Sequence, residues 1–373
     1  MEMSIVTRIK SILLRSLWNI KPDFLASRQV KKLNKGVHIT IHGGYDFLPH
    51  ILENCEFFLS KEQLADKQFL DKVIHDIVKS YYLYGTNANE YFCYKFPEKC
   101  HRERKTYLPR LKKDLMLVHQ MHGHHQYFFG QIKDKNAFYE MAKPFFGREA
   151  CRVEVDDDLQ SFASFVQKYP CFIAKPTRGG CGKGIEILSL KDFEGDAKKA
   201  FDYLREENSS YIVEELVEQD PRIAEWNSSS LNTIRVPSMR TKNGVVVFYP
   251  SIRIGRAGCI IDNAGAGGTF AAIDPKTGVV ITDGFDKRGH IYKEHPDSHK
   301  PYKGSEIPEW DTLLSFTKQL HESMPEQHKY LAFDLALSTK GWVVVEANWG
   351  ELTMPQVEFG KGLYQEFKTL LES

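Results

Sequence analysis

The feature that most constrains the fold is a pair of apolar runs near the end of the sequence, each carrying oxygen-bearing side chains. The first run contains Asp334, and the second ends on Glu346 and Asn348. Thr339-Lys-Gly lies between them, so the two runs are predicted to pair as an antiparallel hairpin. Glu346 and Asn348 are two residues apart and therefore lie on one face of a strand.

If the runs pair, the Asp334 carboxylate sits beside the other two side chains. Carboxylate and amide oxygens are ligands that Mg²⁺ prefers. The sequence therefore predicts a magnesium site formed by Asp334, Glu346 and Asn348. The alternative is a strand end whose acids are simply solvated.

Composition limits the class of protein. The chain has 373 residues, 42% of them hydrophobic and 27% charged, enough for two or three structural units. A net charge of +1 gives no reason to expect nucleic-acid binding. Seven cysteines without a CxxC spacing indicate free thiols in a reducing cytosol, so we expect a cytoplasmic protein. No secretory signal peptide and no transmembrane run are expected.

Residues 4–20 have apolar side chains at helical spacing, with Arg8, Lys10 and Arg15 among them. Two interpretations stay open. The helix lies on a membrane surface, which would make the protein peripheral at the inner face of a membrane. Alternatively, it packs on its own domain, as such stripes ordinarily do.

Periodicity indicates an α+β fold with a mainly antiparallel sheet. Residues 1–120 are expected to be mostly helical, 121–220 to form one lobe and 221–373 a second. Strands are predicted at 171–176, 184–189, 211–217, 232–239, 245–254, 269–273, 278–282, 330–337 and 342–347. Helices are predicted at about 61–82, 110–121, 134–147, 191–207, 308–323 and 356–371, with Asp134 capping the third.

A glycine-rich segment follows the strand at 171–176. Lys175 stands at the strand end, and Arg178, Gly180, Gly182 and Lys183 follow. Glycines let backbone N–H groups approach a phosphate, and the cations add attraction. The spacing is not that of a Walker A loop. The alternative is a hairpin loop whose basic residues face water.

The strand at 211–217 ends in acids. Backbone groups near Glu215 and Val217 are suited to reading adenine, while Glu214 lies just before them and Glu218 just after, where a carboxylate could take ribose hydroxyls. Asp220 is an alternative to Glu218 for the ribose. The other interpretation is a half-exposed strand with solvated acids.

Three arginines lie in or beside apolar strands: Arg235, Arg253 and Arg256. A buried guanidinium is costly unless it is paired or bound to an anion. Arginine also binds phosphate or carboxylate through two parallel hydrogen bonds. One such residue would suggest a structural ion pair, but three near two glycine-rich turns favour an anionic active site.

The histidines at 119, 122, 124 and 125 are a weaker candidate. They have no supporting cysteine and no HExxH spacing, so a polar helix end or loop is preferred to a zinc site.

The motifs below, in the order in which they occur along the chain, resemble those of the ATP-grasp superfamily. They are Lys135 after Asp134, Lys175-Pro with the glycine loop, Glu214-Glu215-x-Val217, Asn232-Thr-Ile-Arg235, then Asp334 and Glu346-Ala-Asn348. More narrowly, the chain resembles the sugar-transfer-associated branch, which is linked to surface polysaccharide and teichuronopeptide biosynthesis. Asp262-Asn263, Gln356 and Gly360-Lys-Gly362 are further cues. The resemblance covers about residues 85–365.

The resemblance implies that ATP lies between two α+β lobes with mainly antiparallel sheets. Lys135 and Lys175 would contact its phosphates, and the 178–184 loop would close over them. Asp334, Glu346 and Asn348 would hold one or two Mg²⁺ ions, with Mn²⁺ as a substitute. Arg235 and Arg253 would neutralise charge that develops during the reaction.

Three functions stay open. The first is a ligase that joins a small-molecule or glycan carboxylate to an amine through an acylphosphate, forming ADP. The second is a kinase that phosphorylates a sugar hydroxyl, with Asp262 as its only candidate base. The third is a non-catalytic nucleotide-binding partner of glycosyltransferases, which would have no need of a metal triad.

Overall fold

The computed structural model describes residues 17–121, 124–180, 182–207, 210–260, 262, 265, 267–350 and 352–373. The chain divides into two compact units. The N-terminal unit is Met1–Gly123 with Glu351–Lys368, and the larger unit is His124–Gly350 with Thr369–Ser373. In the described residues, no helix has the length and apolar character needed to cross a membrane.

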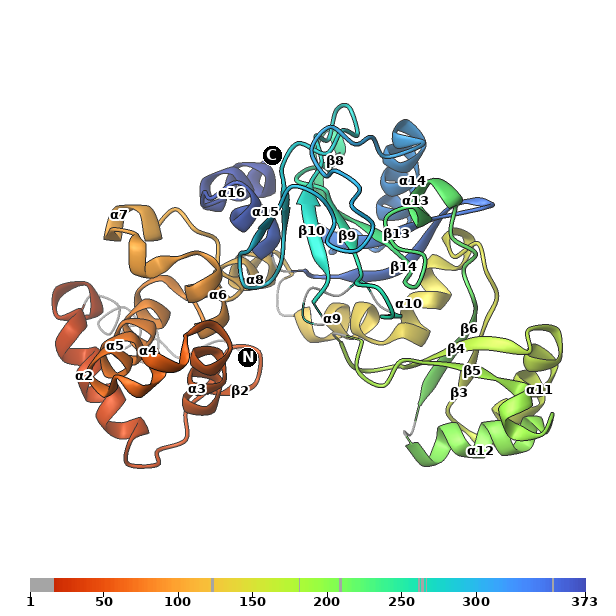
Figure 1. The fold of residues 1–373 in the computed structure, drawn as a ribbon, viewed down its shortest axis with the longest axis horizontal. Helices are drawn as coiled ribbons and strands as arrows, with labels where there is room; N and C mark the ends of the chain where they lie inside the picture. Colours follow the sequence, from red (N-terminus) through yellow and green to blue (C-terminus); the bar gives the residue numbers. More distant parts are fainter. Residues whose placement is uncertain are drawn as a thin grey trace. The chain divides into compact units, whose positions relative to one another are not determined.

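The N-terminal unit is helical (Figure 1). Its helices are α2 (Pro22–Leu33), α3 (Phe47–Phe58), α4 (Lys61–Ala65), α5 (Lys67–Tyr84), α6 (Ala88–Cys93), α7 (His101–Arg104), α8 (Arg110–Gln120), α15 (Thr353–Glu358) and the start of α16 (Tyr364–Glu372). A two-stranded ribbon joins β1 (Thr40–Ile41) to β2 (Tyr45–Asp46). The apolar face of α5, including Ile77 and Val78, is fully buried in the core of this unit.

The larger unit contains two antiparallel sheets (Figure 1). The small sheet has the order β3–β6–β4–β5, from β3 (Ala150–Val153), β6 (Tyr211–Glu215), β4 (Cys171–Pro176) and β5 (Glu186–Ser189). Helices α11 (Leu159–Lys168) and α12 (Ala197–Glu207) pack against it and bury Phe162 and Phe201 with Phe172 of β4.

The main sheet has the order β12–β11–β10–β9–β7–β13–β14, and β8 also pairs with β7. Its strands are β7 (Thr233–Thr241), β8 (Gly244–Val247), β9 (Ser251–Ile254), β10 (Thr269–Ala272), β11 (Gly284–Phe285), β12 (Ile291–Tyr292), β13 (Tyr330–Ser338) and β14 (Gly341–Asn348). Helices α9 (His125–Lys133), α10 (Lys135–Ala142), α13 (Pro221–Ala224) and α14 (Trp310–Ser323) each bury apolar side chains in one core with it. The α+β class with antiparallel sheets is confirmed.

Several predicted elements differ in detail. Asp66 ends α4 and caps α5, so the helix expected at 61–82 is two helices. The strand expected at 245–254 divides into β8 and β9 because Tyr249 has a positive φ of 50° and Pro250 cannot donate to a ladder. At 278–282 there are only isolated bridges, such as Val279 with Glu306. Gly360, at φ 60°, lies between α15 and α16 in the predicted helix 356–371.

Candidate active site

One face of the main sheet is polar where four strands run side by side. In the register, Asp334 of β13 lies opposite Glu346 of β14 and also opposite Arg235 of β7. Thr233, two residues before Arg235, lies opposite Arg253 of β9. The predicted hairpin therefore forms, and it brings the predicted metal and arginine residues together on one surface.

A β-bulge in β14 gives this face its polarity. Asp334 pairs with Glu346, but the next residue, Leu335, pairs with Val344, so Val345 is the extra residue. Val344 and Ala347 both belong to the apolar core. The extra residue changes which side chains of β14 point to the core between Val344 and Ala347. As a result Glu346 points away from the core, to the same side as Asp334.

The Asp334 carboxylate is clamped by two guanidinium groups. Arg235 donates from Nε and Nη2 to its two oxygens at 2.6 and 2.7 Å, and Arg253 donates from Nη1 at 2.7 Å. Burial alone would raise the pKa of Asp334, but the two arginines outweigh it and hold that pKa well below its usual range. Asp334 is therefore an anion at any physiological pH.

Glu346 has the opposite environment. Burial and the neighbouring negative charge of Asp334 both raise the pKa of Glu346. Asn348 donates from Nδ2 to Glu346 Oε1 at 2.9 Å, which partly opposes this rise. Two carboxylates in contact with unequal pKa values are typical of functional sites.

Asp262 extends the network. It pairs with Arg253 at 3.0 Å and accepts a hydrogen bond from the Thr233 hydroxyl. Burial raises the pKa of Asp262, the Arg253 guanidinium opposes this shift, and Asp334 adds to it. Arg256, the third predicted arginine, instead pairs with Asp297 at 2.8 Å.

Lys175 at the end of β4 is buried against Glu214 of β6, with Nζ 2.8 Å from Oε2. Burial lowers the pKa of Lys175, and the carboxylates of Glu214 and Glu346 oppose that shift. Arg148 donates to the same Glu214 oxygen at 2.8 Å from Nε and to the carbonyl oxygen of Val344 at 2.7 Å. Arg148 thus joins the small sheet to the main sheet.

Sequence reasoning missed Arg148. Its two partners lie 66 and 196 residues away, and no local pattern announces it. The only available signal was a lone arginine just before the strand β3.

The glycine-rich loop after β4 rests on the start of α10. Lys135 donates from its backbone N–H to the carbonyl oxygen of Thr177 at 3.1 Å, and from Nζ to that of Pro176 at 3.0 Å. Arg178 approaches Asp134, the cap of α10, at 3.5 Å, and its side chain is 86% exposed. The loop thus carries an exposed arginine beside Lys135.

Two glycines of this loop have backbone conformations that other residues rarely adopt. Gly182 has φ 73° and Gly184 has φ 70°. Between them, the Lys183 N–H donates to the carbonyl oxygen of Gly180 at 3.4 Å. Cys181 lies outside the described residues. The turn is therefore tight, and the Lys183 N–H forms a hydrogen bond within it.

The segment after β6 forms one wall of a small pocket of about 110 Å³, which we call the hinge pocket. Its lining consists of Gly147, Arg148, Glu215, Leu216, Val217, Glu218, Ser338, Thr339, Lys340 and Val343. The Thr339 N–H donates to the carbonyl oxygen of Glu218 at 3.0 Å, which ties the segment to the β13–β14 hairpin. Asp220 accepts from Arg222 through both oxygens, so Glu218 is the freer of the two ribose candidates.

The predicted zinc alternative has no support in the described chain. His119 and His124 are exposed, whereas His122 and the His125 side chain lie outside the description. Among the described residues, no three His, Cys, Asp or Glu side chains gather as a metal site. The six described cysteines are free thiols.

Residues 122–371 match the family described as sugar-transfer associated ATP-grasp. The chain belongs to this ATP-grasp family. The match covers the larger unit except its last two residues, all of α15 and all but the last residue of α16, so the polar face, the glycine-rich loop and the hinge pocket fall inside it. No curated protein matches the chain.

Solved ATP-grasp structures are distant from this family member. An N5-carboxyaminoimidazole ribonucleotide synthetase in complex with ADP is 16% identical, with a TM-score of 0.36 over 59% of this chain. The ligase PsnB with its minimal precursor is 12% identical, with a TM-score of 0.39 over 65%. D-alanyl-alanine synthetase A from Vibrio cholerae is 11% identical, with a TM-score of 0.36 over 65%. The match spans only 45%, 60% and 66% of those three chains.

The donor set of this ATP-grasp protein fits a divalent cation in kind, since two carboxylates and an amide oxygen are hard ligands. A bound cation would stabilise the Glu346 carboxylate most, because it would offset the repulsion between Glu346 and Asp334. Asp334 differs, since its oxygens already accept from Arg235 and Arg253. A metal bound here would share Asp334 with the arginines.

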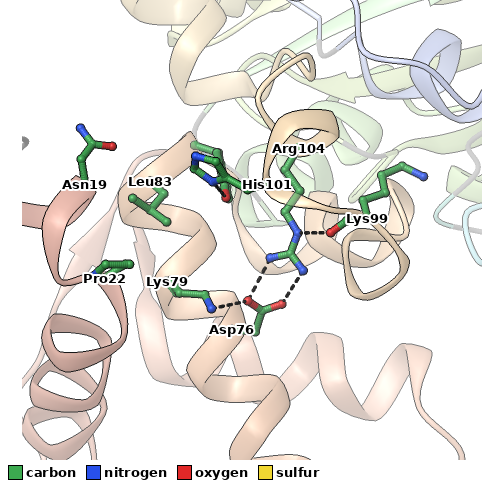
Figure 2. A pocket seen from close by; sticks show the side chains of 9 residues that line it. Asn19, Pro22, Asp76, Lys79, Leu83, Lys99, His101 and Arg104 are labelled. Carbon is green, nitrogen blue, oxygen red and sulfur yellow. Dashed lines mark hydrogen bonds and ion pairs between the residues drawn. The ribbon is translucent and has the colours of Figure 1, made fainter.

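Residues 1–121 lie outside the family match, and they carry a second pocket of about 260 Å³ (Figure 2). In the wall of this pocket, Arg104 forms a bidentate ion pair with Asp76, with both contacts at 2.9 Å. Lys79 lies 3.5 Å from Asp76 and 3.0 Å from Asp23 of α2. Most charged groups of this wall form ion pairs with one another, and these ion pairs hold the helices of the unit together.

Proposed function

We propose that this protein is an ATP- and Mg²⁺-dependent ligase that joins a carboxylate to an amine and forms ADP. The observation that carries the proposal is the polar face of the main sheet. There the acids Asp334 and Glu346 meet the guanidinium groups of Arg235 and Arg253. A face of this kind suits a metal–triphosphate and a reacting carboxylate.

The nucleotide would lie between the small and main sheets. Lys175 and Lys135 are the candidate phosphate ligands, and the loop from Arg178 to Lys183 would cover the phosphates. The backbone from Glu215 to Val217 would meet adenine in the hinge pocket. Glu218 is the candidate for the ribose, because Asp220 is held by Arg222.

Asp334, Glu346 and Asn348 would hold one or two Mg²⁺ ions, which supply charge neutralisation of the phosphates when bound. In the reaction, a substrate carboxylate oxygen attacks the γ-phosphorus, and the bond to the β-phosphate oxygen breaks, giving an acylphosphate and ADP. An amine then displaces phosphate and loses a proton, giving the amide. Arg235 and Arg253 would stabilise the developing negative charge.

The family description points to a sugar-transfer setting, so we propose a capsular or other surface polysaccharide, or its precursor, as the carboxylate substrate. Such work would proceed in the cytoplasm, where ATP is supplied, alongside glycosyltransferase partners.

One observation favours a kinase as the second candidate. Asp262 is buried beside Arg253, and its pKa is raised, as suits a base that takes a proton from a sugar hydroxyl. In that case the γ-phosphate would stay on the product.

Product analysis separates the candidates. The full chain is incubated with γ-labelled ATP, Mg²⁺, uronic-acid oligosaccharides and a set of amines. The ligase yields ADP and free labelled phosphate in amounts equal to the amide formed. The kinase yields ADP with the label on the glycan. AMP and pyrophosphate as products would contradict both.

A further inference from the structure

The start of the N-terminal unit exposes large apolar side chains beside basic ones. Leu17 is 47% exposed, Ile20 71% and Phe24 66%. Large apolar residues clustered on a surface mark an interaction site more often than scattered ones do. We call this region the α2 surface; its members are Leu17, Ile20, Lys21, Phe24, Arg28, Lys31, Lys32 and Lys35.

Helix α2 lies between this surface and the core of the N-terminal unit. Phe24, Arg28 and Lys31 recur at spacings of four and three, so they lie on one face of the helix. Ala26 and Leu33 are buried on the opposite face. That buried face packs against α5 (Figure 1). The Ser27 hydroxyl lies 3.1 Å from His75 Nε2. The exposed face is thus held outward by a well-packed inner face.

The α2 surface is strongly basic for this chain. Residues 1–35 contain eight Lys and Arg but only Glu2 and Asp23 as acids, a net charge of +6. The whole chain carries +1, so the remaining residues carry −5. Asp23 is neutralised by Lys79 at 3.0 Å.

The five cations of the α2 surface have no internal role in the part of the chain that the structure describes. Across those ranges, none of Lys21, Arg28, Lys31, Lys32 and Lys35 forms an ion pair. Their charges are therefore available to an external anion.

We propose that the α2 surface docks the protein on an anionic phospholipid membrane. The exposed apolar side chains enter the interface, and the cations contact the lipid phosphates. A nucleic acid would explain the cations but not the three exposed apolar side chains. A second copy of the chain would bring two like-charged surfaces together. This inference does not depend on the ligase chemistry.

The test is sedimentation of the full chain with lipid vesicles. We expect partitioning onto phosphatidylglycerol–phosphatidylcholine vesicles, weakening at high salt, and little onto pure phosphatidylcholine. Replacing Arg28, Lys31 and Lys32 with Gln should lower the partition coefficient about a hundredfold, since each cation contributes about fivefold. Ile20→Ser with Phe24→Ser should lower it about tenfold or more.

The matched controls replace exposed residues of the larger unit: Lys276, Lys303 and Lys318 with Gln, and Ile291→Ser. Both should bind like the wild type. The proposal is overturned if the wild type does not sediment with anionic vesicles, or sediments equally with neutral ones. It is also overturned if the α2 variants, folded by circular dichroism, bind as well as the controls. ATP binding should be unchanged in every variant, whichever chemistry the site performs.

Discussion

Two adjacent carboxylates, Asp334 and Glu346, have opposite environments. Asp334 is clamped by Arg235 and Arg253, whereas Glu346 meets a like charge and one amide. The first residue stabilises the folded chain, and the second is held in an unfavourable state that a cation would relieve. This difference leads to separate predictions for the two residues.

Glu346→Gln should lower turnover by at least about a hundredfold, because it removes a metal-binding charge. Its melting temperature should not fall, because Gln keeps the hydrogen bond from Asn348 and removes the repulsion from Asp334. Phosphate release and thermal denaturation measure the two effects, with Glu294→Gln as control. Normal turnover in the variant would remove Glu346 from the mechanism.

Asp334→Asn should destabilise the fold by about 3–5 kcal/mol, because it leaves buried guanidinium groups without their counter-charge. The control Asp297→Asn breaks the more exposed pair with Arg256 and should cost less than about 1 kcal/mol. Urea denaturation compares the two variants. Equal, small losses would show that the clamp on Asp334 contributes little.

At residue scale, the period of two along a strand correctly places Glu346 and Asn348 on one face. It does not reveal the bulge at Val345, because a bulge depends on how the partner strand pairs. The Arg148 contacts were also beyond prediction, since they join residues far apart in the sequence.

At the scale of elements, α14 is fixed to β7 by a buried histidine. His321 Nδ1 lies 2.8 Å from the Ser238 hydroxyl, and Nε2 lies 2.8 Å from the carbonyl oxygen of His328. Burial lowers the pKa of His321 to about 4. The imidazole is thus neutral in the folded chain under ordinary conditions.

This histidine predicts acid sensitivity. The unfolded imidazole takes up a proton near its usual pKa of about 6.5, while the folded one does so only near 4, so the unfolded state binds more protons between these values. The free energy of unfolding should fall by about 3 kcal/mol from this group as pH drops from 6.5 to 4. Urea denaturation across this range should show a shallower pH slope for His321→Gln. Equal slopes would contradict the assignment.

The hairpins at Lys242-Asn-Gly and Thr339-Lys-Gly formed as predicted, because glycine turns between apolar runs are local signals. The strand β4 at Cys171–Pro176 also matches its predicted range. In contrast, α11 was not predicted, although it buries Phe162, Phe165 and Val166.

At the scale of the whole molecule, the chain leaves the N-terminal unit, forms the larger one and then returns. The returning helix α15 carries Gln356, which is fully enclosed. Its amide oxygen accepts from the Leu108 N–H at 2.8 Å, and its nitrogen donates to the Tyr94 hydroxyl at 3.0 Å and to the Leu352 carbonyl at 2.8 Å. One side chain thus fastens α15 to segments some 250 residues earlier. Sequence alone gave Gln356 only as a family cue.

Gln356→Leu should therefore lower the free energy of unfolding of the N-terminal unit by about 3 kcal/mol, because several buried partners lose their hydrogen bonds. The exposed Gln160→Leu serves as control and should have little effect. Hydrogen exchange at α6 and α8 should rise in the first variant and not in the second. Unchanged exchange would show that the return of the chain is held by other contacts.

The central claim is an ATP site whose phosphates meet Lys175 and whose metal meets Glu346. Calorimetric titration with a non-hydrolysable ATP analogue, with and without Mg²⁺, tests it most directly. The wild type should bind in a Mg²⁺-dependent manner, and Glu346→Gln and Lys175→Met should each weaken binding by about tenfold or more, while the exposed control Lys168→Met should not. A folded wild type that does not bind, or binding unchanged in both site variants, would contradict the account.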